Sequence, residues 1–188
     1  MEGKNQQLKI MLTMMLDAIG DDSGREGLLE TPDRVIKSWH QLYSGYKGNL
    51  KDLFKVFTNE GTDQMIICKD IEFYSMCEHH VQPFYGKAHV AYIPDKKIVG
   101  LSKLARVTDH FARRLQNQER LTDQIASAIE KHLKPKGVGV IMQGKHFCMM
   151  SRGVQKQNSS MVTSALKGVF HDDHVKQEFI DLTRGKNG

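Results

Sequence analysis

Strand-like segments in this sequence come in two pairs, and two helical segments lie between the pairs. This order limits the fold, because four main strands cannot close a barrel within one chain and an open sheet leaves edges that must be paired or covered. Short runs of apolar or alternating residues bounded by Gly, Pro and Asp indicate each strand. The four strands are expected at residues 65–73, 87–93, 137–150 and 160–170.

The two intervening segments have apolar residues at helical spacing. The first is expected to start with Ser102 as its N-cap and to carry a stripe that includes Leu104, Phe111 and Leu115. The second covers 121–133 and ends before Pro135. Helices between pairs of strands indicate an α+β fold with a mostly antiparallel sheet, on which these two helices pack.

Further helices are expected at both ends of the chain. Residues 6–19 repeat apolar side chains at helical spacing, and "TPDRVIKSWHQLY" predicts a helix with Thr31 as its cap and Pro32 in its first turn. A last amphipathic helix is expected around 175–182. We therefore divide the chain into an N-terminal helical region, 1–62, and an α+β domain, 63–188.

Composition narrows the class of protein. Hydrophobic residues make up 39% and charged residues 26% of the 188 residues, which suits a packed globular domain. No apolar run reaches membrane-spanning length and the N-terminus lacks a signal-peptide pattern, so we expect a cytoplasmic protein without a membrane partner. The net charge of +5 favours an anionic partner, either nucleic acid or a phosphorylated small molecule.

The segment "SMCEHHVQPF" gathers residues that bind metals. Cys77 and His80 are separated by two residues, so a turn can bring both to one ion. A third ligand must come from elsewhere, and Cys148 is the obvious candidate; on a predicted strand it would share a face with His146. Two thiolates and one imidazole form a zinc-like set that leaves a position for water, and zinc makes such a water a usable nucleophile near neutral pH.

Packing is the alternative explanation for these cysteines. A single Cys-x-x-His pair is a weak motif, and free cysteines are commonly buried as small apolar residues. Three cysteines are too few for a disulfide scaffold, which favours reduced thiols or metal ligands. Cys68 has no metal-binding neighbours, and we expect it to fill the core.

Several separate motifs occur in one order: "ETPDRV", "CEHH", "GLSKLARV", "QERLT" and "HFCMMSRGV". Together they span nearly the whole chain, and the combination closely resembles the GTP cyclohydrolase I family. The resemblance implies zinc-dependent hydrolysis of GTP, with opening of the imidazole ring, release of formate, rearrangement and closure to 7,8-dihydroneopterin triphosphate. This is the first step of pterin and tetrahydrofolate biosynthesis.

The resemblance also implies roles for individual residues. The family's zinc ligands correspond to Cys77, His80 and Cys148, and its acid–base histidines correspond to His79 and His146. Imidazoles suit that work because they gain and lose protons near pH 7. The remaining implied positions are Ser102 near the ribose, Glu119 with Gln118 at the guanine, and Lys103, Arg106, Arg152 and Arg34 at the triphosphate.

The residue types at these positions suit the substrate. Guanine presents N1–H and a 2-amino group side by side, and one carboxylate such as Glu119 can accept from both. Several cations and a helix N-terminus suit a triphosphate. Glu78, between Cys77 and His79, receives no assigned role.

The resemblance further implies a tunnelling fold, in which sheets from several subunits join into a barrel, and a homodecamer of two pentamers with sites between subunits. Arg34 is our candidate for a residue contributed by a neighbour. Two alternatives remain: a nitrile reductase acting on a deazaguanine, and a zinc-stabilised nucleic-acid-binding module. The second would normally close its metal shell with a fourth protein ligand and carry a groove-reading helix or an aromatic platform, and the sequence shows neither. We therefore expect GTP, and not nucleic acid, as the partner.

Overall fold

The computed structural model describes residues 2–184, and their contacts divide the chain into two compact units, Met1–Ser44 and Gly45–Gly188. The expected division after residue 62 concerns where the catalytic part begins, and it stays a prediction.

The first unit is a pair of helices, α1 (Glu2–Ala18) and α2 (Thr31–Leu42). An ion pair of 2.6 Å between Lys9 and Asp33 links them. The N-cap of α2 is Glu30 and makes no side-chain capping bond, so the expected cap at Thr31 is wrong. Pro32 does lie in the first turn, where its missing N–H costs nothing.

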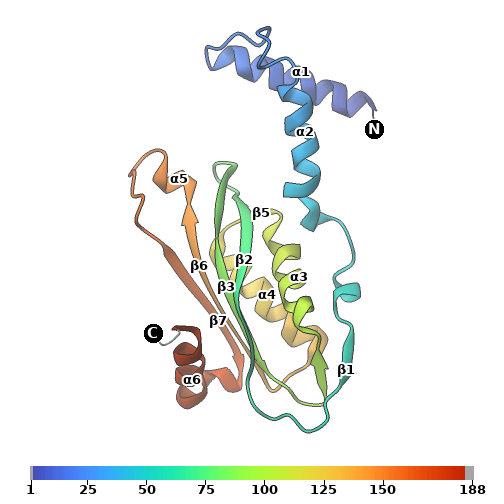
Figure 1. Ribbon diagram of the computed structural model, residues 1–188, viewed down its shortest axis with the longest axis vertical. Helices are drawn as coiled ribbons and strands as arrows, with labels where there is room; N and C mark the ends of the chain where they lie inside the picture. Colours follow the sequence, from blue (N-terminus) through green and yellow to red (C-terminus); the bar gives the residue numbers. More distant parts are fainter. Residues whose placement is uncertain (1, 185–188) are drawn as a thin grey trace. The chain divides into compact units, whose positions relative to one another are not determined.

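The second unit is built on one long sheet with the strand order β5-β2-β3-β6-β7 (Figure 1). Its four main strands are antiparallel neighbours, as the sequence predicts. They are β2 (Ile66–Cys77), β3 (Gln82–Ile93), β6 (Gly137–His146) and β7 (Met161–Gly168). The expected four-stranded sheet has a fifth, short strand, β5 (Leu115–Gln116), which pairs in parallel with the end of β2.

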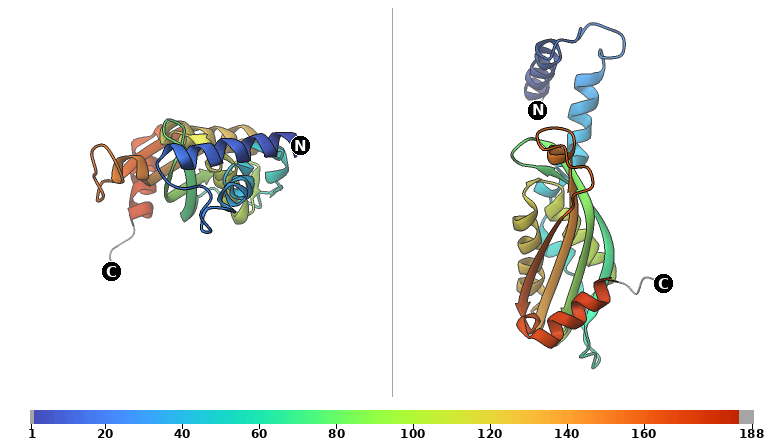
Figure 2. Two further views of the ribbon diagram at one scale, coloured as in Figure 1. Left: turned by 90° about the horizontal axis from the view of Figure 1, so that it is seen from above. Right: turned by 90° about the vertical axis from the view of Figure 1, so that its left-hand side faces the viewer.

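Two helices cover one face of this sheet: α3 (Leu101–Ala112) packs on β2, and α4 (Gln118–Leu133) packs on β6 and β7 (Figure 2). The main core lies between these layers, where the fully buried side chains include Phe73, Phe84 and Leu121. The sequence places α3 too late: its N-cap is Gly100, not Ser102, and Leu115 lies in β5.

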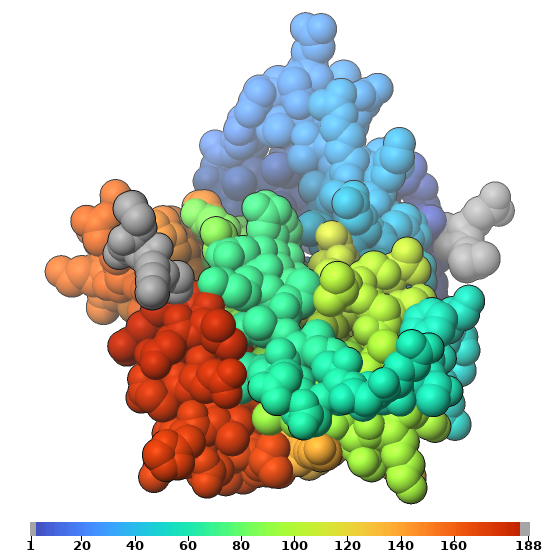
Figure 3. Space-filling model, turned by 60° about the horizontal axis from the view of Figure 1, so that its bottom comes forward, coloured from blue at the N-terminus to red at the C-terminus, as the bar shows by residue number. Residues whose placement is uncertain are grey.

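The other face of the sheet carries a smaller core. There α6 (Asp173–Arg184) follows a 3-10 turn, η3 (Val169–His171), and packs Phe179 against Phe170 and Ala91. A second sheet pairs β1 (Val56–Thr58) with β4 (Lys97–Val99), after two 3-10 turns, η1 (Ser44–Tyr46) and η2 (Leu50–Leu53). In the space-filling view α6 is red and the segment around β1 is teal (Figure 3).

A bulge in β2 decides which side chains of that strand face the helices. The pairing of β2 with β3 shifts between Cys68 and Ile71, and Asp70 there has a left-handed φ of 55°. The extra residue changes the alternation, so Ile71, Phe73 and Cys77 all point to the buried face. Cys77 thus reaches the end of the strand with its sulfur on the helix side.

Among the described residues, no helix is both long enough and apolar enough to cross a bilayer.

Candidate metal centre

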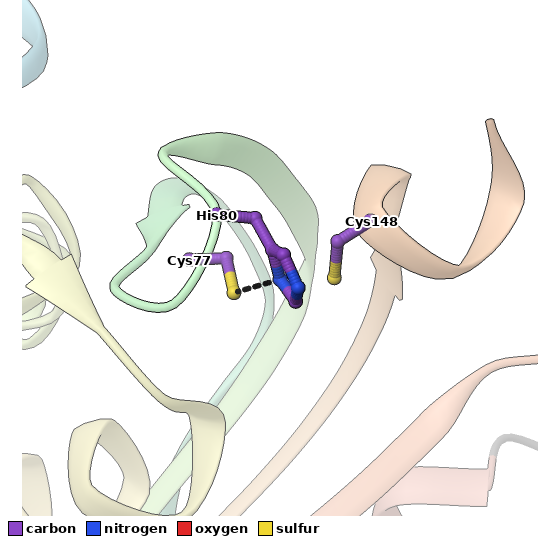
Figure 4. A group of neighbouring side chains, drawn as sticks. All are labelled: Cys77, His80 and Cys148. Carbon is purple, nitrogen blue, oxygen red and sulfur yellow. Dashed lines mark hydrogen bonds between the residues drawn. The ribbon is translucent and has the colours of Figure 1, made fainter. Parts of the chain in front are cut away.

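The three predicted ligands come together at one end of the sheet. Cys77 is the last residue of β2, His80 lies in the turn to β3, and Cys148 lies in a short helix, α5 (Phe147–Met150), that follows β6. Their ligand atoms all lie within 4.8 Å of one another. Figure 4 shows the three side chains directed toward a common point.

Backbone hydrogen bonds in the turn hold the first two ligands together. The Cys77 carbonyl accepts from the N–H of His80 at 3.4 Å and from that of Val81 at 2.8 Å. Val81 closes the turn with a left-handed φ of 52°. The register then pairs Cys77 with Gln82, so β3 starts directly after the turn.

The third ligand is held differently from the expectation. The strand β6 ends at His146, and Cys148 sits in the first turn of α5, so the two do not share a strand face. The three side chains do come together, but the shared strand face expected for His146 and Cys148 is wrong. Pairing of Phe84 with His146 in the neighbouring strand places α5 beside the β2–β3 turn.

One distance within the group matches the spacing of two ligands on a zinc ion. Tetrahedral bonds of about 2.3 Å to sulfur and about 2.05 Å to nitrogen put the two donor atoms about 3.6 Å apart. The Cys77 Sγ to His80 Nδ1 distance is 3.6 Å. Burial, and then the neighbouring Cys77, raises the pKa of the Cys148 thiol, so a metal ion bound there would have to displace its proton.

His146 lies in the same neighbourhood and is tightly held. Its Nε2 is 2.9 Å from Gln118 Oε1, and its ring stacks on Phe84 with centroids 4.4 Å apart and planes 6° apart. Burial lowers the pKa of His146, while the Glu119 carboxylate opposes that shift. The interaction shows that Glu119, in the first turn of α4, approaches His146.

His79 has carboxylate company that the sequence left without a role. Glu78 Oε1 lies 3.7 Å from His79 Nε2 and accepts from the Asn117 side chain at 3.0 Å. Arg120 forms an ion pair with the same carboxylate, and its hydrogen bond is the largest cause of the lowered pKa of Glu78. The position of Glu78 between Cys77 and His79 could have indicated from the sequence that it belongs to the site. Nothing in the sequence indicates that Arg120 lies beside it.

Most of the residues predicted to bind the ribose and the triphosphate do not lie near the metal ligands of the same chain. The twelve residues of α3 span about 18 Å, and the helix starts after β4, at the end of the sheet opposite to Cys77. Ser102 and Lys103, in its first turn, and Arg106 therefore lie toward the far end from the ligands. Arg152 is four residues after Cys148, and its charge partly offsets the rise in the pKa of that thiol. Arg34 pairs with Glu30 in the first unit.

Two thiols, an imidazole and a second, half-buried imidazole define a candidate metalloenzyme centre. Comparison with known proteins then supplies the family. The family model for GTP cyclohydrolase I matches residues 8–184. The chain belongs to the GTP cyclohydrolase I family.

Individual relatives agree over nearly the whole chain. A GTP cyclohydrolase 1 from Leptospira biflexa is 54% identical over 93% of this chain and 96% of its own length. One from Wolinella succinogenes is 50% identical over 98% of this chain and 100% of its own length. One from Deinococcus radiodurans is 56% identical over 90% of this chain and 80% of its own length. A crystal structure of the archaeosine synthase QueF-Like covers 58% of this chain and 97% of its own, with 14% identity and a TM-score of 0.47.

Proposed function

We propose that this chain hydrolyses GTP, releases formate and closes the product to 7,8-dihydroneopterin triphosphate, the first step of pterin and folate synthesis. The observation that carries this proposal is the meeting of Cys77, His80 and Cys148 beside His146, in a chain of the GTP cyclohydrolase I family. The catalytic part is assigned to residues 63–188.

The donor set fits zinc, with Cys77, His80 and Cys148 as its ligands. A zinc ion held there would supply a water ligand with a pKa near 7, and so a nucleophile for C8 of guanine at neutral pH. His79 and His146 handle protons as the imidazole ring of the substrate opens, because His79 Nδ1 lies 4.0 Å from Cys77 Sγ and His146 is two residues from Cys148. Burial keeps His146 neutral near pH 7, ready to accept a proton.

Substrate recognition is assigned to residues around this centre. Glu119 accepts from N1–H and the 2-amino group of guanine, and its approach to His146 supports that placement. Gln118 adjoins it at the recognition site and acts there through His146, which its amide oxygen faces. Arg152 approaches Cys148 and would place a cation near the triphosphate. Ser102 near the ribose, and Lys103, Arg106 and Arg34 at the phosphates, complete the assignment.

The position of α3 supports a site shared between subunits. The first turn of α3 lies at the far end of the sheet from Cys77, so one chain cannot present both Lys103 and the metal ligands to one GTP molecule. We propose that sheets of several copies join edge to edge into a barrel and that a neighbouring copy supplies α3. β7 is an edge strand of the five-stranded sheet, which leaves one side open for such pairing. The expected assembly is a decamer of two pentamers.

A direct assay tests the function. The zinc-loaded protein is incubated with GTP, and formate and the fluorescent oxidised pterin are measured together. ATP serves as the control substrate, and His146→Ala serves as a variant that keeps all three ligands. Formate and pterin from GTP alone, with a strong loss in His146→Ala, are expected. A zinc-loaded wild-type oligomer that releases no formate from GTP would refute the proposal.

A further inference from the structure

Gln118 is a glutamine whose amide group is enclosed and fully engaged by the protein. Its side chain is 0% exposed although it is the first residue of α4. The amide nitrogen lies 3.2 Å from the Met142 carbonyl, 3.0 Å from the Met161 carbonyl and 3.0 Å from Thr163 Oγ1. Its two hydrogens therefore have three acceptors, on β6 and β7.

These contacts fix which way round the amide lies. The carbonyl oxygens of Met142 and Met161 can only accept, so they must face the NH₂ group of Gln118. The amide oxygen then faces His146, where Oε1 and Nε2 are 2.9 Å apart. Because Oε1 can only accept as well, Nε2 of His146 must carry a hydrogen. In a neutral imidazole the other nitrogen, Nδ1, then holds the free lone pair.

A hydroxyl chain extends the same restraint. Thr122 Oγ1 donates to the Gln118 backbone carbonyl at 2.7 Å and lies 2.7 Å from Thr163 Oγ1. Thr163 can therefore accept from the Gln118 amide and donate to Thr122. The bonds form a closed circuit between the first turn of α4 and β7, which holds the Gln118 side chain in one position.

The backbone of β6 leaves room for this arrangement at one residue. A Cβ on Gly144 would overlap Gln118 Oε1, so only glycine lets the amide oxygen reach His146. The Phe84 ring, stacked on the imidazole, fixes its plane. Ring plane and hydrogen-bond direction are thus set by two different neighbours.

We infer that Gln118 is a positioning residue that holds His146 as the Nε2–H tautomer and leaves the lone pair of Nδ1 free. Both amide hydrogens of Gln118 are used inside the protein, so its part in the reaction runs through His146. The inference rests on the proposed function only for its effect on the reaction. The tautomer itself can be observed without any substrate.

The direct test is magic-angle-spinning NMR of the zinc-loaded oligomer labelled with ¹⁵N-histidine. His146→Asn identifies the His146 signals by subtraction. We expect the wild-type protein to show the Nε2–H tautomer. Gln118→Met keeps the length of the side chain without its amide, and His146 should then show the Nδ1–H tautomer or a mixture. A wild-type Nδ1–H signal, or an unchanged tautomer in Gln118→Met, would overturn the inference.

Gly144→Ala is a second variant, in case Gln118→Met does not fold. It leaves the amide intact but displaces its oxygen, so the tautomer should change in the same way. Gly3→Ala is the matched control, because a Cβ there meets nothing within 4 Å. It should leave the His146 signals as in the wild type.

Kinetics separate positioning from substrate contact. Gln118→Met and Gly144→Ala should lower kcat for formate release by roughly 10–100-fold, as loss of a group that orients a functional histidine commonly does. The KM for GTP should stay within about twofold, because uniform binding is untouched. Ser164→Ala removes a hydroxyl of β7 that lines a hollow beside α6, and it should match the wild type.

A raised KM with unchanged kcat would instead make Gln118 a substrate contact and would overturn the positioning role. An altered tautomer with unchanged kcat would also overturn it. If the wild type releases no formate from GTP, the proposed function fails, while the NMR result still decides how His146 is held.

Discussion

Removal of one sulfur from the metal centre should abolish tight metal binding. Zinc sites with four protein ligands bind with about 10–16 kcal/mol, or roughly 2.5–4 kcal/mol for each ligand. Cys148→Ser takes one of three ligands from the group that lies within 4.8 Å. Because about 1.4 kcal/mol is a factor of ten, zinc affinity should fall roughly 10²–10³-fold. The variant should also lose formate release, since the nucleophile depends on the ion.

Metal titration against a chromophoric chelator measures the affinity, and elemental analysis after gel filtration measures the zinc content. Cys68→Ser is the matched control: the same exchange is made on β2, at a half-buried cysteine that packs against the main core. It should keep the zinc content of the wild type. Equal zinc affinity in Cys148→Ser and the wild type, or equal loss in both variants, would refute the ligand assignment.

Three further predictions follow from the same structure. Glu119→Ala should lower kcat/KM for GTP by roughly 10–100-fold and should lose the preference for GTP over inosine triphosphate, which lacks the 2-amino group. The control Glu130→Ala, on the same helix, should show neither effect. An intact preference in Glu119→Ala would exclude Glu119 as the guanine contact. Oligomers reassembled from inactive Cys148→Ser and inactive Lys103→Ala should regain part of the activity, and verified mixed oligomers that stay inactive would argue against a shared site. Burial lowers the pKa of His89, so the unfolded chain takes up a proton at a higher pH than the folded chain, and the free energy of unfolding should fall as pH drops below about 6.5. His89→Asn should reduce that loss in urea titrations at several pH values. The same pH dependence in the variant and the wild type would refute this prediction.

Much of the fold could be predicted because its signals are local. Apolar periodicity predicts the two helices that cover the sheet, α3 and α4, as well as the final helix α6, and alternation predicts the four long strands. The sequence places the end of β2 too early and the start of β3 too late, because Cys77 and Gln82 belong to a polar segment that looks like a loop. The two-residue strand β5 has no pattern of its own, and it exists only because the end of β2 lies beside it.

The centre was predictable in part for the same reason. The close spacing of Cys77 and His80 is visible in the sequence. Two ligands are too few for a stable zinc site, so a third had to be sought elsewhere in the chain. That Gln118 is buried could not be predicted, since the first residue of a helix is usually exposed and polar. Its environment is made by carbonyl groups of β6 and β7, which the sequence brings close only through the whole sheet.

The proposed ligands Cys77 and Cys148 are separated by more than a third of the chain, yet they meet at one end of the sheet, one at the end of β2 and one in α5 after β6. A chain still being synthesised cannot hold the ion fully until α5 has emerged and β6 has joined β3. A bound ion would then act as a removable cross-link that closes a long loop, and it would favour the folded state by mass action. Chelation should accordingly lower the melting temperature, and metal supply should limit how much of the newly made protein persists in its folded form.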